Sequence, residues 1–218
     1  MVTTIVLAGG KSLRLGRDKA LEEIGGQSLI ERVIDRLSPL DTEIILVTAQ
    51  SNLSLLPDLG VKTVVDVYPG KGALGGIYSG LKASPSFHSL VVACDMPFLN
   101  IALLRHLIEL CPPFDVVIPK VDEKTEPLHA VYSKNCLAPI EAMLKLDRLK
   151  ISGFFNAVKV RYVEDAEVEK FDPERLSFFN INSKADLERA RALLEREETG
   201  MRYALMRHGE IRRELGES

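Results

Sequence analysis

The chain has 218 residues, of which 46% are hydrophobic, so it is long enough to bury one sizeable core. Its net charge of −3 argues against non-specific binding to nucleic acid, which usually needs a basic surface. No apolar run is long enough to cross a membrane and no signal peptide is recognisable, so we expect no membrane contact and a cytoplasmic location. Three cysteines without a CxxC pair fit a reducing compartment and argue against a zinc site or a disulfide framework.

Strand-like and helix-like segments alternate along the chain. Hydrophobic patterning predicts strands at 3–7, 43–48, 61–66, 90–94, 116–118, 128–132, 158–163 and 178–181, and helices at 28–37, 74–83, 101–110, 137–146 and 183–195. This order is typical of an α/β fold, here a single Rossmann-like three-layer domain with a mostly parallel sheet. Ligands in such folds bind beyond the carboxyl ends of the strands, so the loops after Leu7, after Asp66 and at Asp95 are expected to meet at one cleft.

A basic, glycine-rich segment at residues 7–19 follows the first predicted strand. Three glycines, two lysines and two arginines fall between Gly9 and Lys19. Glycine lets backbone N–H groups approach an anion closely, and cations neutralise a polyphosphate. The segment is not a Walker A loop, because Ile5 stands where that pattern needs its first glycine. The sequence therefore indicates a nucleotide-phosphate site of another geometry.

A second glycine cluster opens a competing interpretation. Gly70, Gly72 and Gly75 form a GxGxxG pattern before a predicted helix, and Asp95 follows 20 residues after the last glycine. That layout is typical of an NAD-dependent dehydrogenase. Residues 66–69 separate the strand from the first glycine, however, and the first strand–helix unit already carries a better phosphate loop. The dehydrogenase remains a remote alternative.

The buried strand at 90–94 ends in a carboxylate, Asp95. Burying a carboxylate at a strand end is costly unless something compensates its charge. Mg²⁺ bound to nucleotide phosphates would do so, because magnesium typically uses one or two carboxylates together with phosphate oxygens and water. The alternative is that Asp95 caps the helix predicted to begin near Ile101.

The first loop resembles the signature LAGGxSxRxGxDK of the molybdenum cofactor guanylyltransferases and their nucleotidyltransferase superfamily. All fixed positions of that signature are met, by Leu7, Ala8, Gly9, Gly10, Ser12, Arg14, Gly16, Asp18 and Lys19. The second cluster resembles the PGxGPLGG stretch of that family, with Ala73 in place of proline. The segments around Asp95 and Asn182 resemble its CDMP and NxN stretches.

The resemblance implies the nucleotide-diphospho-sugar transferase type of fold over residues 1–196, with 197–218 as a tail of unassigned role. It implies Mg²⁺-dependent transfer of GMP from GTP to molybdenum cofactor (molybdopterin), with release of pyrophosphate. The implied metal ligands are Asp95 and Asn182. The implied catalytic residues are Lys19, Arg14 and Asp95. The implied nucleotide-binding residues are Leu7, Ala8, Gly9, Gly10, Lys19, Asp66 and Asp95. A labile product implies handover to a molybdoenzyme apoprotein or a chaperone.

Several alternatives stay open on the sequence alone. CTP or another phosphorylated acceptor, such as a sugar phosphate or cobinamide phosphate, would use the same chemistry. A non-catalytic nucleotide-binding regulator would have no need of the carboxylate Asp95. Asp66 could be a turn residue and Asn182 a helix cap. His129 could meet the acceptor, although a lone histidine is more often structural.

Overall fold

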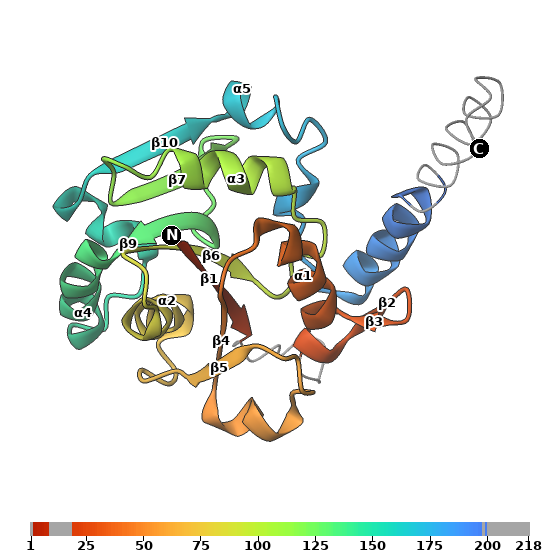
Figure 1. Ribbon diagram of the computed structural model, residues 1–218, viewed down its shortest axis with the longest axis horizontal. Helices are drawn as coiled ribbons and strands as arrows, with labels where there is room; N and C mark the ends of the chain where they lie inside the picture. Colours follow the sequence, from red (N-terminus) through yellow and green to blue (C-terminus); the bar gives the residue numbers. More distant parts are fainter. Residues whose placement is uncertain (1, 9–18, 198, 200–218) are drawn as a thin grey trace.

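The computed structural model describes residues 2–8, 19–197 and 199. Within these residues one sheet dominates the molecule, with the strand order β10-β7-β9-β6-β1-β4-β5 and β8 paired to β7 (Figure 1). The strands are β1 (Val2–Ala8), β4 (Ile44–Thr48), β5 (Lys62–Val65), β6 (His88–Ala93), β7 (Val116–Val121), β8 (Lys124–Thr125), β9 (His129–Ser133) and β10 (Val160–Glu164). Along this path only β9 runs against its neighbours. The prediction of a mostly parallel sheet is confirmed.

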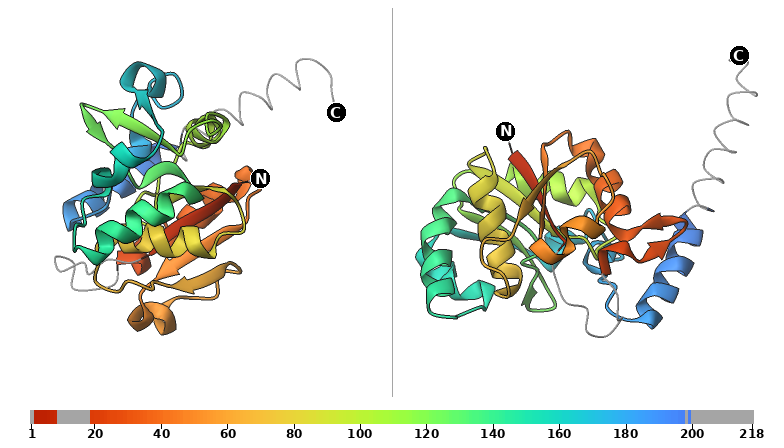
Figure 2. Two further views of the ribbon diagram at one scale, coloured as in Figure 1. Left: turned by 90° about the vertical axis from the view of Figure 1, so that its left-hand side faces the viewer. Right: turned by 90° about the horizontal axis from the view of Figure 1, so that it is seen from below.

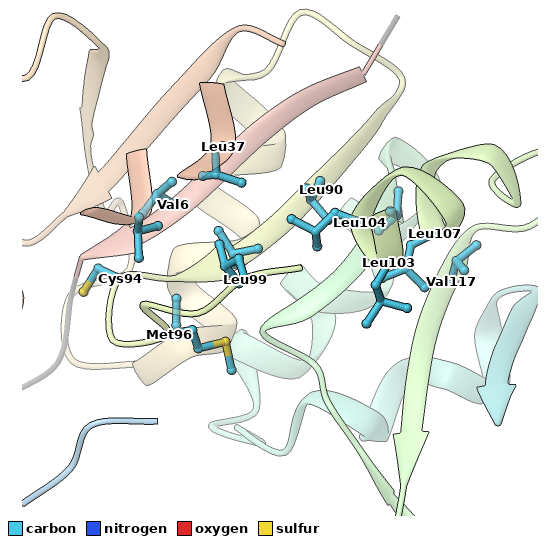
Figure 3. Packing of buried hydrophobic residues seen from close by; sticks show 14 of the residues in the cluster. Val6, Leu37, Leu90, Cys94, Met96, Leu99, Leu103, Leu104, Leu107 and Val117 are labelled. Carbon is cyan, nitrogen blue, oxygen red and sulfur yellow. The ribbon is translucent and has the colours of Figure 1, made fainter. Parts of the chain in front are cut away.

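Helices cover both faces of the sheet. They are α1 (Leu29–Leu37), α2 (Gly72–Ala83), α3 (Ile101–Glu109), α4 (Leu137–Lys145) and the short α5 (Asp165–Val168). Alternate residues of a strand point to opposite faces, so Val6 packs with α1 and α3, whereas Ile5 packs with α2 and α4. Figure 3 shows the first of these cores, where Val6 lies near Leu37 and Leu90 lies beside Leu104. The sheet and the helices on its two faces thus form three layers, as predicted.

The third, smaller core joins the C-terminal helix, residues 184–197, to a hairpin near the N-terminus. Strands β2 (Glu23–Ile24) and β3 (Gln27–Ser28) form the hairpin, and its two-glycine turn has positive φ at Gly25 and Gly26. A Cβ on Gly25 would lie 2.3 Å from a methyl of Leu194, so glycine also permits the close contact. Both figures show the blue helix beside this hairpin (Figures 1 and 2).

The predicted strand at 178–181 is wrong. Residues Leu176–Phe178 form a 3-10 helix, and the chain after it pairs with loops instead of a neighbouring strand. Asp172 accepts hydrogen bonds from the N–H groups of Leu176 and Ser177 at 3.2 and 2.8 Å, which holds the turn. The other predicted elements are confirmed with small differences at their ends. The β2–β3 hairpin, β8 and α5 were not predicted.

No helix in the described part of the chain combines the length and apolar character needed to cross a bilayer.

Candidate active site

Four strand ends meet at one edge of the sheet. The N–H of Cys94, after β6, donates to the carbonyl of Leu7 in β1 at 3.1 Å. The hydroxyl of Thr48, at the end of β4, donates to the carbonyl of Ala8 at 3.1 Å. The N–H of Asp66, after β5, donates to the carbonyl of Thr48 at 2.8 Å. These bonds bring the end of β1, Asp66 and the turn that holds Asp95 to the same edge, where the sequence predicted one cleft.

Of the first loop, the structure describes its beginning, Leu7 and Ala8. The side chains of Leu7 and Ala8 are buried in the cores on opposite faces of the sheet, and their carbonyls take part in the bonds above. Any contact of these two residues with a nucleotide must therefore come from the backbone. Gly9, Gly10 and Arg14 lie outside the described residues, as does the side chain of Lys19, whose backbone begins the 3-10 helix Lys19–Leu21.

Asp95 lies two residues after the end of β6 and is partly buried. Helix α3 is capped by another residue: the Asn100 side chain accepts from the N–H of Leu103 at 3.0 Å. The helix-cap alternative for Asp95 is therefore removed. Its neighbours Cys94 and Met96 are buried in the core shown in Figure 3, so the turn that carries the carboxylate is anchored on both sides.

The segment that carries Asn182 lies against Asp95. The N–H of Ile181 donates to the carbonyl of Asp95 at 3.0 Å, although 86 positions separate them in the chain (181 − 95). The helix that follows is capped by Ser183, whose hydroxyl accepts from the N–H of Asp186 at 3.2 Å. The structure thus brings the two predicted metal ligands onto adjoining segments, and it gives the capping role to Ser183.

Asp95 and Asn182 are residue types that fit a divalent cation shared with a nucleotide. One carboxylate and one amide oxygen would supply hard oxygen ligands of the kind that Mg²⁺ prefers, and phosphates and water complete its shell in such sites. Among the described residues no group of three or more His, Cys, Asp or Glu side chains could hold a metal ion by itself. The chemistry of Asp95 and Asn182 therefore suits a cation that arrives with phosphate ligands.

Asp66 is held firmly by its surroundings. Its Oδ1 accepts hydrogen bonds from the N–H of Tyr68 at 2.9 Å and from the hydroxyl of Ser79 at 2.7 Å. The first of these is the local bond of an Asx turn, so the turn role considered for Asp66 is present in the structure. Its other oxygen, Oδ2, lies 3.2 Å from the place where a Cβ on Gly75 would be. A turn role and a ligand role are compatible, because each can use a different oxygen.

Sequence reasoning missed Thr48, whose hydroxyl connects two strand ends, and Ser79, whose hydroxyl connects α2 to Asp66. Both side chains are buried, at 0% and 2% exposure, and both make the hydrogen bonds described above. Thr48 had a signal, because it is the polar last residue of an apolar strand. Ser79 had none, because it lies within α2 and meets Asp66 only through the packing of that helix.

His129 is fully buried, and neither ring nitrogen has a hydrogen-bond partner in the described structure. Its ring lies against Phe178, with centroids 4.9 Å apart. Burial lowers the pKa of this imidazole to about 3, so it is neutral at physiological pH. The structure gives His129 a place in the core, against Phe178.

The second glycine cluster does not form a dinucleotide site. The strand before it, β5, is the last strand of the sheet, whereas dinucleotides bind where the strand order reverses within a sheet. The turn at 66–71 separates β5 from α2, with positive φ at Gly70 and at Gly72, the first residue of α2. The dehydrogenase alternative is therefore wrong, and the cluster instead forms the turn that presents Asp66.

Comparisons with known proteins agree with this geometry. The family model of the MobA-like NTP transferase domain matches residues 4–158. A protein of Pelotomaculum thermopropionicum named a probable molybdenum cofactor guanylyltransferase is 37% identical over 198 residues, which are 91% of this chain and 96% of the relative. The molybdenum cofactor guanylyltransferase of Desulfosudis oleivorans is 36% identical over 198 residues, 89% of this chain and 96% of its own.

A solved structure is similar over the same extent. The molybdopterin-guanine dinucleotide biosynthesis protein A of Archaeoglobus fulgidus has a TM-score of 0.79 and 30% identity, covering 89% of this chain and 100% of its own. The site lies within the matched residues except for Asn182. The chain thus belongs to the family of MobA-like NTP transferases.

Proposed function

We propose that this protein is a magnesium-dependent molybdenum cofactor guanylyltransferase. It transfers GMP from GTP to molybdenum cofactor and releases pyrophosphate. One observation carries the proposal: the carboxylate residue Asp95 lies at the sheet edge where the phosphate-binding loop begins, with the Asn182 segment hydrogen-bonded to it. Membership of the family, whose curated relatives are named for this reaction, supports the choice of substrates.

The chemistry is a displacement at phosphorus. An oxygen of the acceptor's phosphate attacks the α-phosphorus of GTP, the new P–O bond forms, and the bond to the β-phosphate oxygen breaks as pyrophosphate leaves. The attacking phosphate is already ionised, so the reaction needs no covalent enzyme intermediate. The protein has to align the two phosphates and neutralise charge that develops on the leaving group.

The residues of this chain divide that task. Asp95 and Asn182 would hold the divalent cation, which we propose to be Mg²⁺. When bound, the cation withdraws charge from the phosphate oxygens. Lys19 and Arg14 would bind the triphosphate, and the planar fork of Arg14 suits phosphate oxygens. The backbone of Leu7, Ala8, Gly9 and Gly10 would line the nucleotide.

Asp66 would select the base. A guanine presents its N1–H and its 2-amino group side by side, and a carboxylate oxygen can accept from such donors. Cytosine and adenine lack this pair of donors. In the structure Oδ1 of Asp66 already has two donors, which favours Oδ2 as the atom that meets the base.

The compartment and the onward route of the product are also proposals. All three cysteines are free and buried, which fits the reducing cytoplasm. The guanylylated cofactor would then pass to a molybdoenzyme apoprotein or a chaperone.

The experiment that tests the proposal is an assay of pyrophosphate release. The purified protein is incubated with Mg²⁺, molybdenum cofactor and each of the four NTPs in turn, with EDTA and acceptor-free reactions as controls. Of the four NTPs, we expect only GTP to give pyrophosphate release, and only when both metal and acceptor are present. Release with CTP would overturn the choice of base. Release with GTP only when a sugar phosphate or cobinamide phosphate replaces the cofactor would overturn the acceptor.

A further inference from the structure

Ser79 connects helix α2 to the turn that carries Asp66. Its hydroxyl oxygen lies 2.7 Å from Oδ1 of Asp66 and accepts a hydrogen bond from the N–H of Val67 at 3.0 Å. The side chain is only 2% exposed, so water does not replace these partners easily. One hydroxyl therefore holds both the carboxylate of Asp66 and the backbone of the next residue.

The hydroxyl has one proton and two acceptors within reach. The carbonyl of Gly75, one turn earlier in α2, lies 2.9 Å away, and Oδ1 of Asp66 lies 2.7 Å away. A hydrogen bond to an ionised carboxylate is shorter and stronger than one to a neutral carbonyl. The proton of Ser79 therefore goes to Asp66, and with the N–H of Tyr68 it gives Oδ1 two donors.

The second oxygen of Asp66 is treated differently. A Cβ on Gly75 would lie 3.2 Å from Oδ2 of Asp66 and 2.9 Å from the carbonyl oxygen of Tyr68. A side chain at position 75 would cover Oδ2 and push against the turn. Glycine places no side-chain atom against this oxygen, while Ser79 and the Tyr68 N–H fix the other one.

We propose that Ser79 is a positioning residue for base recognition. It holds Asp66 in the one orientation that leaves Oδ2 for the adjacent N–H donors of a guanine base. This inference rests on the proposed function in one respect, the assignment of base reading to Asp66. A merely structural role for Ser79 would lower the stability of the α2 junction without changing which nucleotide is preferred.

The test compares the binding of GTP and ITP, which lacks the 2-amino group, by calorimetry with Mg²⁺ and without any acceptor. Wild type is expected to bind GTP more tightly than ITP. In Ser79→Ala the ratio of the two dissociation constants should fall about tenfold, because a loosened carboxylate loses a charge-assisted hydrogen bond. Ser79→Cys keeps a side chain of similar volume but donates a weaker hydrogen bond, so it should lower the ratio as Ser79→Ala does. Ser79→Thr keeps the hydroxyl and should restore the ratio.

Ser84→Ala is the matched control, because Ser84 is a buried serine at the other end of α2 whose hydroxyl forms hydrogen bonds with Ser86 and Ser89. It should leave the ratio unchanged. The double variant Ser79→Ala with Asp66→Asn should be no less selective than Asp66→Asn alone, because Ser79 acts through Asp66.

Two failures are distinguishable. A wild-type protein that binds CTP, titrated in the same way, as tightly as GTP contradicts the proposed function. A wild-type protein that prefers GTP, with the preference intact in Ser79→Ala and Ser79→Cys, overturns the role of Ser79 alone. Additive losses in the double variant overturn it as well.

Discussion

The two halves of the sheet are built differently. Strands β1, β4, β5 and β6 run parallel to one another, so all their carboxyl ends reach the same edge. In the other half β9 runs against both β6 and β7. His129, at the start of β9, pairs with Val92 near the end of β6, so the residues before β9 arrive at the edge that carries Asp95.

Because of this difference, the edge of the sheet that carries Asp95 receives groups from both halves. The parallel half provides the end of the glycine loop's strand, Asp66 and Asp95, each from a strand end. The other half reaches the edge through the beginning of an inverted strand, β9, and the segment around Ile181, outside the sheet, bonds to Asp95 there. We expect the parallel half to hold the nucleotide and the other half to lie on the side of the acceptor.

The largest effect is expected for Asp95, where the two halves meet. Asp95→Ala should reduce transfer by about 10³-fold or more, because the cation loses its only carboxylate ligand in the proposed site. Pyrophosphate release measures the loss. Asp95→Asn is an isosteric second variant with the same expected direction, and Asp58→Asn, at an exposed aspartate, is the control. Substantial activity in both Asp95 variants would remove the metal site from this place.

Lys19 tests the nucleotide half alone. Lys19→Ala should lower kcat about 10²-fold, because charge on departing pyrophosphate is no longer neutralised. Steady-state kinetics with GTP separate this from simple binding, since a change confined to KM would show uniform ground-state binding. Lys170→Ala, at an exposed lysine, should leave both constants unchanged.

His129, in β9, tests the other half of the sheet through the pH dependence of the protein's free energy of unfolding. Burial lowers the pKa of folded His129 to about 3, so below pH 6.5 the unfolded chain takes up a proton that the folded chain refuses. Stability is therefore complete above pH 6.5 and declines as the pH falls toward 3. At pH 5 the loss should be about 2 kcal/mol.

Urea unfolding at pH 7 and pH 5 measures this loss. The leucine variant His129→Leu has no proton to bind, so its stability should depend less on pH by about that amount. His88→Gln keeps His129 and should follow wild type. Equal pH dependence in wild type and His129→Leu would show that this histidine is not the acid-sensitive group.

The smallest effect sharpens the assignment of Asp66. Asp66→Asn should lower the preference for GTP over CTP about tenfold, because an amide replaces one carboxylate oxygen with an N–H donor that opposes those of guanine. Competition between the two nucleotides in the pyrophosphate assay measures the preference. Unchanged discrimination, relative to the control Asp58→Asn, would leave Asp66 as a turn residue only.

Much of the fold was predictable because it depends on local patterns. The alternation of strands and helices, the buried run that ends at Asp95 and the glycine loop after β1 are all written in short stretches of sequence. The strand expected at 178–181 failed because apolar residues there pack under a turn held by Asp172, a residue that patterning does not connect to them.

The site was predictable only in its parts. Asp66, Asp95 and the loop residues could be identified by position at strand ends, but their mutual contacts come from packing between distant segments. The bond from Ile181 to Asp95 and the hold of Ser79 on Asp66 exist only once α2 and the C-terminal segment are docked on the sheet.

The central claim, transfer of GMP to molybdenum cofactor, is tested most directly by following labelled phosphate. GTP labelled at the α-phosphate and GTP labelled at the γ-phosphate are each incubated with the protein, Mg²⁺ and molybdenum cofactor, and the pterin product is isolated. The account predicts α-label in the pterin product and γ-label in pyrophosphate alone. An unlabelled pterin product with α-labelled GTP would contradict it.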